Sequence, residues 1–134
     1  MGVASTIAVS GLNVASLRLQ VAASNIANSL SAGPLPDAIN PESFPAAYTP
    51  LQVNQTDLVD GGTSATVSAV SPATISSFDP TTPFANSNGM VASPNVDLAN
   101  EFLQLMIVRI SYAANAQLIR ADAQMSASLL NIMC

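Results

Sequence analysis

The distribution of proline constrains the fold of this chain more than any other sequence feature. All nine prolines lie between residues 34 and 94, and residues 1–33 and 95–134 contain none. Proline lacks a backbone donor and breaks the interior of a helix. We therefore predict three segments: an N-terminal helix within 1–31, a non-helical insert at 32–94, and a C-terminal helix within 95–134.

The N-terminal segment has the spacing of a helix that is apolar on two faces. One line of residues alternates spacings of four and three, the a/d pattern of a coiled coil. It consists of Ala8, Leu12, Ala15, Leu19, Ala22 and Ile26. A second line on another face consists of Val3, Ile7, Val14, Leu17 and Val21. A surface helix usually carries one apolar stripe, so this helix is expected to be buried on two sides. Asn, Ser and Gly at 28–33, followed by Pro34, predict its end.

The C-terminal segment repeats this design over a greater length. Asp97 can cap the first turn of the helix. One line of residues alternates spacings of three and four, and it consists of Phe102, Leu105, Arg109, Tyr112, Ala116, Ile119, Ala123, Ser126, Leu130 and Met133. About 36 helical residues would form a rod of roughly 54 Å. The predicted fold class is mainly α, with the two terminal helices paired as a coiled coil around a small Pro-rich insert of strands and loops.

The insert contains two stretches with strand-like patterns. Residues 47–53 and 65–70 alternate or carry β-branched side chains, and Asp60-Gly61-Gly62 between them is a turn signal. They predict a short β-hairpin, which would be marginally stable alone and should therefore lean on another part of the chain. Residues 72–94, rich in Pro, Ser and Asn, are expected to form an extended loop.

Charge and composition exclude several functions. The chain has three Arg, no Lys, eight acidic residues and no His, and its formal net charge is −5. Binding to nucleic acid is not expected, because phosphate backbones require a basic patch. No zinc site or histidine-based chemistry is expected either, and we predict no cofactor and no metal. The only enzymatic candidates are scattered carboxylates, so an enzyme is disfavoured.

The low charge also raises the question of a membrane protein. The uncharged runs 1–17, 19–36 and 61–78 are interrupted by Ser, Asn, Gly or Pro, so we expect no direct membrane insertion. No basic region precedes the first apolar stretch, so we expect no cleaved signal peptide. The single cysteine, Cys134, is expected to be a free thiol.

Two helices with two apolar faces each cannot cover all their apolar surface by pairing with one another. Large exposed apolar surfaces signal association, and few charges are present that an interface would have to bury. Composition and periodicity therefore favour a subunit of a polymer. The alternative is an ordinary helical bundle with a loop insert, which two long helices do not form by themselves.

Both helical segments resemble the flagellar axial proteins, the bacterial rod and hook family. The stretch SGLNVASLRLQVAASNIAN at 10–28 is similar to the N-terminal signature of that family. PNVDLANE at 94–101 and YAAN at 112–115 are similar to its C-terminal motif, and PFANSNGMV at 83–91 resembles its proximal rod subunits. Proximal rod subunits usually carry a basic, Tyr-containing stretch after the first helix. Here the insert has no Lys or Arg, and Tyr48 can stand in for that tyrosine.

The resemblance implies a structural subunit of the flagellar basal-body rod. Such a subunit is exported through the flagellar type III apparatus and polymerises through its terminal helices into the drive shaft that crosses the periplasm. Its partners would be copies of itself and other rod proteins. An alternative is a secreted helical-hairpin effector or binding protein of a related export system.

We expect the assembly interface to include residues from both helices, namely Leu12, Leu19, Asn25, Ile26, Asn28, Phe102, Leu105, Arg109, Tyr112, Asn115 and Ile119. The side-chain amides of Asn25 and Asn28 are either bonded to neighbouring helices or part of a simple helix end. Arg109 either extends to solvent along the surface or pairs with an acid of a neighbouring subunit. Tyr112 is expected to pack in the core or in an interface.

Overall fold

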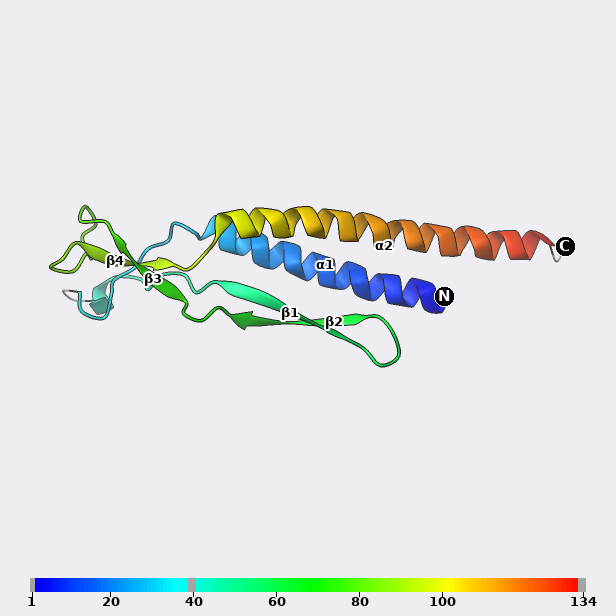
Figure 1. Ribbon diagram of the computed structural model, residues 1–134, viewed down its shortest axis with the longest axis horizontal. Helices are drawn as coiled ribbons and strands as arrows, with labels where there is room; N and C mark the ends of the chain where they lie inside the picture. The colour runs from blue at the N-terminus through cyan, green and yellow to red at the C-terminus, as the bar shows by residue number, and fades with distance from the viewer. Residues whose placement is uncertain (1, 39–40, 133–134) are drawn as a thin grey trace.

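The structure, a computed structural model, describes residues 2–38 and 41–132. Within these residues two long helices and two β-hairpins form an elongated molecule (Figure 1). The elements in chain order are α1 (Val3–Ala27), a 3-10 turn (Pro41–Ser43), β1 (Leu51–Asp57), β2 (Thr63–Ala69), β3 (Thr74–Phe78), β4 (Met90–Pro94) and α2 (Leu98–Ile132). The predicted arrangement of two terminal helices around a small β region is therefore confirmed.

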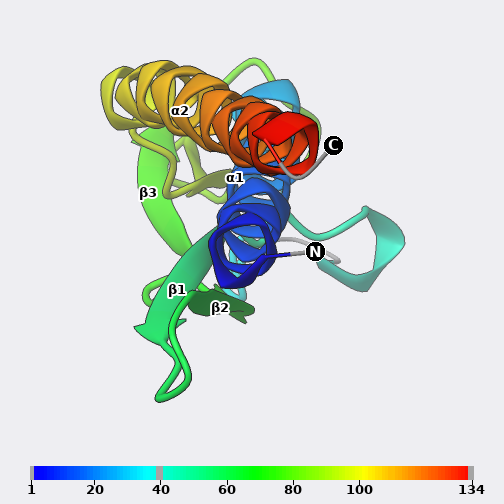
Figure 2. The same cartoon turned by 90° about the vertical axis from the view of Figure 1, so that its right-hand side faces the viewer.

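The two helices lie side by side and run in opposite directions. Asn25, near the end of α1, bonds to Glu101 in the first turn of α2, and Gly11 lies against Asn115 further along. Both ends of the described chain consequently lie toward the same end of the molecule (Figure 1). Seen along the long axis, α1 is sandwiched between α2 and the first hairpin (Figure 2). A regular coiled coil between the helices stays a prediction.

The helix ends follow the signals in the sequence. α1 ends at Ala27, where the backbone N–H groups of Asn28 and Ser29 donate to the carbonyl oxygens of Ser24 and Ile26, respectively. At the start of α2, Asp97 Oδ1 accepts from the backbone N–H groups of Ala99 and Asn100, at 3.0 and 3.2 Å. Asp97 thus satisfies two of the free donors at the start of the helix, which confirms the predicted cap.

The first hairpin pairs β1 with β2 in an antiparallel register from Leu51↔Ala69 to Asp57↔Thr63. The hairpin is confirmed, although β1 begins four residues later than predicted. Gly61 and Gly62 form its turn with φ of +86° and +88°, a conformation that residues with a Cβ rarely adopt. The hairpin lies against α1, where the backbone N–H of Thr63 donates to Ser10 Oγ at 3.0 Å. It therefore leans on another element, as a two-stranded sheet must.

The expectation of an extended loop at 72–94 was wrong. β3 and β4 pair in an antiparallel register from Thr74↔Pro94 to Phe78↔Met90 and form a second hairpin. A loop of eleven residues joins them, and Asn86 Oδ1 closes it by accepting from the backbone N–H groups of Asn88 and Met90. The proline and serine content concealed this hairpin, because Pro94 occupies the last position of β4, where a proline is tolerated.

Candidate assembly interface

A buried asparagine joins three parts of the chain. Asn25 is 1% exposed, and its Nδ2 donates to the backbone oxygen of Leu51 at 2.8 Å and to Glu101 Oε1 at 2.6 Å. Its Oδ1 accepts from the backbone N–H of Leu51 at 3.0 Å and from the Tyr48 hydroxyl at 3.1 Å. An amide side chain has two donor hydrogens and two acceptor lone pairs, and all four are used here. Asn25 therefore fixes α1 against both β1 and α2.

The neighbouring asparagine of the same motif has a different role. Asn28 Nδ2 donates to the backbone oxygen of Ser24, four residues earlier in α1. Of the two interpretations left open by the sequence, the helix-end interpretation thus describes the observed bond of Asn28, whereas Asn25 reaches another helix of the same chain. The Tyr48 hydroxyl also lies 3.0 Å from Ser24 Oγ, which places this tyrosine at the junction.

The contact between α1 and α2 contains mainly small and polar residues, together with Val108. A Cβ built on Gly11 would lie 2.7 Å from the side-chain atoms of Asn115, so a glycine is needed for this close approach. Residues three or four positions from Gly11 share its helix face. Ala8 and Ala15 do so and are almost completely buried, as is Ala22. Within Leu98–Ile132, all of which the structure describes, only Val108 is buried.

Several large apolar residues of both helices remain exposed outside this contact. Leu19 is 48% exposed, and Phe102 and Tyr112 are each 53% exposed. The predicted a/d lines therefore describe the contact inside the chain only in part: the alanines of the α1 line are buried, whereas the larger residues lie beside the contact. Of the other predicted residues, Asn25 is buried and Arg109 is exposed, and the rest are half-buried. Those half-buried are Leu12, Ile26, Asn28, Leu105, Asn115 and Ile119. A role in contacts between subunits stays a prediction for the whole set.

The end of α2 extends past the start of α1. A Cβ built on Gly2 would lie 2.9 Å from Asp122 Oδ1, so Asp122 is level with the beginning of α1. Residues 123–132 continue as a helix beyond that point (Figure 1), and all of them are exposed. We call this segment the α2 extension. Its apolar side chains include Met125, Leu129, Leu130 and Ile132. Met133 and Cys134, on which the sequence also made predictions, lie outside the described residues.

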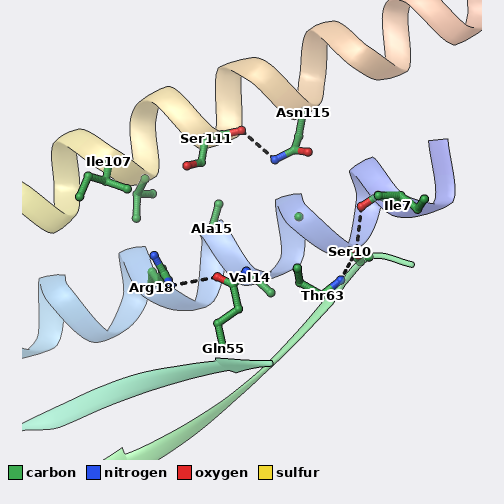
Figure 3. Close-up of a pocket in the computed structure, with 13 residues that line it drawn as sticks. Ile7, Ser10, Val14, Ala15, Arg18, Gln55, Thr63, Ile107, Ser111 and Asn115 are labelled. Carbon is green, nitrogen blue, oxygen red and sulfur yellow. Dashed lines mark hydrogen bonds between the residues drawn. The ribbon is translucent and has the colours of Figure 1, made fainter. Parts of the chain in front are cut away.

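A groove follows α1 between α2 and the first hairpin. Its larger half, about 440 Å³, is lined in part by polar residues such as Gln52, Asn100 and Gln104. Its other half, about 210 Å³, runs from Ile7 to Arg18 (Figure 3), and we call it the apolar groove. Its lining includes Ile7, Gly11, Val14, Ala15, Ile107 and Val108, with Ser10, Thr63 and Ser111 among the polar residues. Arg18 lines both halves and donates to Gln55 Oε1 at 2.9 Å.

One described helix meets the simplest criteria for crossing a membrane. α2 contains an 18-residue window with a mean hydropathy of 1.2. Only 6% of that window is buried inside the molecule. At 1.5 Å per residue its 35 residues extend roughly 52 Å, well beyond a hydrocarbon core of about 30 Å. Length and composition are weak evidence for a membrane span, because the core helix of a soluble protein passes the same test. In the part of the chain that the structure describes, no three His, Cys, Asp or Glu side chains gather to hold a metal ion.

Antiparallel terminal helices that turn their large apolar residues outward define a class of subunit built for assembly. Comparison with known families identifies the class: residues 87–132 match the family described as flagellar basal body rod FlgEFG protein C-terminal. The chain is also 32% identical over 133 residues to the flagellar basal-body rod protein FlgC of Agrobacterium fabrum, covering 99% of this chain and 95% of the relative. The FlgC proteins of Salmonella typhimurium and Escherichia coli O6:H1 are 33% and 32% identical, each covering 94% of this chain and 92% of the relative. The chain therefore belongs to the FlgC family of flagellar basal-body rod proteins.

Sequence reasoning missed several residues that position these surfaces. Glu101 and Leu51 complete the bonds of Asn25 but are 76 and 26 residues away in the chain. Gly11 lies within the N-terminal motif, and the family resemblance alone assigns it no role. Its position in the middle of a predicted helix was a usable signal. A glycine there costs about 1 kcal/mol of helix stability relative to alanine, and it often marks a point where another element packs closely.

Proposed function

We propose that this protein is a structural subunit of the flagellar basal-body rod that polymerises through the outward faces of its terminal helices. The observation that carries the proposal is the distribution of side-chain size: the α1–α2 contact is filled mainly by small and polar residues, whereas many large apolar residues remain exposed on the outside. Burying a large apolar side chain contributes about 1.5–3 kcal/mol. Neighbouring subunits would supply that burial.

Membership of the FlgC family supports the finer parts of the proposal. Its partners are further copies of this chain and other rod proteins, and its place is the part of the rod that crosses the periplasm. The flagellar type III apparatus exports it without a cleaved signal peptide. Its role is to transmit torque rather than to catalyse a reaction. The nearly full-length similarity to rod proteins favours this role over a secreted effector with paired helices.

The test is to follow the native protein in the organism that makes it. Deleting its gene should abolish swimming, and restoring the gene should restore it. An antibody raised against the purified chain should detect the protein in purified basal bodies from the wild type and not from the deletion strain. A swimming deletion strain, or wild-type basal bodies that lack the protein, would contradict the proposal.

A further inference from the structure

We propose that the apolar groove beside α1 is the docking site for the α2 extension of a second copy of this chain. This inference rests on the proposed function and gives it a specific contact: one segment and one receiving surface, both present on every subunit. Because the two surfaces differ, each copy could receive one neighbour and enter another, as in a head-to-tail polymer.

The first argument is one of length. The α2 extension has ten residues beyond Asp122, which is roughly 15 Å of helix. The apolar groove runs along α1 from Ile7 to Arg18, roughly 17 Å. The Arg18–Gln55 hydrogen bond marks the point where the lining becomes polar, and so sets the end of the apolar half (Figure 3).

The second argument is one of chemistry. Residues 123–132 contain no charged side chain. Met125, Leu129 and Ile132 are spaced by four and three, so they share one helix face, and all three are more than half exposed. Arg18 is the one charged residue that lines the apolar groove in the described part of the chain, and its guanidinium is already bonded. An uncharged, apolar helix can therefore enter without burying an unpaired charge.

The third argument is a buried hydroxyl in the groove lining. Thr63 Oγ1 is buried and has no hydrogen-bond partner among the described residues. Buried polar atoms are nearly always paired. Ser126 and Ser128 flank the apolar face of the α2 extension, and either hydroxyl can supply a partner once the side chains that cover Thr63 Oγ1 shift on docking.

The contact cannot form within one molecule. The groove wall on α2 contains Ser111, and Ser128 lies 17 residues further along the same helix. That spacing corresponds to roughly 25 Å along a straight helix. A short crosslinker between positions 111 and 128 therefore has to join two copies.

The experiment uses the full-length protein in basal bodies, with Cys134→Ser to remove the native thiol. Ser111→Cys is combined with Ser128→Cys, and a short bis-maleimide is added. The matched control combines Ser128→Cys with Ala113→Cys, because Ala113 is exposed and lies about 200° around the helix from position 111. We expect crosslinked dimers from the 111/128 pair at a yield at least about tenfold above the 113/128 pair. Adding Leu129→Asp should lower that yield about tenfold or more, since it places a charge in the groove.

Incorporation into basal bodies is measured by immunoblot in the same samples, which separates the two proposals. Normal incorporation with equal yields from the two pairs, or with no dimer from 111/128, would overturn the docking contact and leave the rod assignment standing. Absence of the unmodified protein from basal bodies would overturn the rod assignment and the docking contact with it.

Discussion

Replacing Asn25 with alanine should destabilise the chain more than any other single polar substitution in α1. The substitution leaves both backbone groups of Leu51 and the Glu101 carboxylate without this partner, whereas the Tyr48 hydroxyl keeps Ser24. A hydrogen bond contributes about 1 kcal/mol net, and a buried group left unpaired costs about 1–3 kcal/mol. Some of the abandoned groups will reach water, so we expect a loss of about 2–4 kcal/mol in the free energy of unfolding.

The measurement is urea unfolding of dilute monomer followed by far-UV circular dichroism. Asn28→Ala is the matched control, because Asn28 makes one side-chain bond, to the backbone of its own helix, and should cost about 0.5–1 kcal/mol. Asn25→Asp tests the polarity of the site: it keeps the shape, but turns a carboxylate oxygen toward the Leu51 carbonyl and Glu101. It should destabilise at least as much as alanine. If Asn25→Ala and Asn28→Ala reduce stability equally, the three-way junction does not hold the elements together.

Three further predictions concern the helices. Gly11→Leu should destabilise the monomer by about 1–3 kcal/mol in the same unfolding assay, because its side chain would collide with Asn115, whereas Ala23→Leu on an exposed position should change it by less than about 0.5 kcal/mol. Leu19→Asp should leave monomer stability within about 0.5 kcal/mol and reduce incorporation into basal bodies, since Leu19 is exposed in the single chain; normal incorporation and swimming would refute an interface at this residue. In hydrogen exchange of the monomer, the amides of 124–132 should exchange faster than those of 11–25, because α1 is covered on two sides and the α2 extension on none; equal protection would contradict this.

The amino-acid sequence determined where the helices begin and end. Proline is excluded from both helices by backbone chemistry, and Asp97 caps α2 through local bonds, so these limits depend on neighbours in the chain. The turn of the first hairpin was equally readable, because Gly61 and Gly62 supply positive φ where the strands reverse. The family resemblance was carried by such local stretches and is confirmed by the full-length similarity to FlgC proteins.

Only the tertiary structure decided which helix faces meet. Two apolar lines on each helix are compatible with several rotations of one helix against the other. Periodicity favours the rotation that buries the line with the larger apolar residues. The structure instead places Gly11 and the alanines inside the contact, because close approach of two helices favours small residues, and leaves Leu19 and Phe102 outside. The partners of Asn25 and the pairing of β3 with β4 depend on residues brought together from far along the chain. Such contacts are set by the packing of whole elements, for which a single sequence contains no local signal.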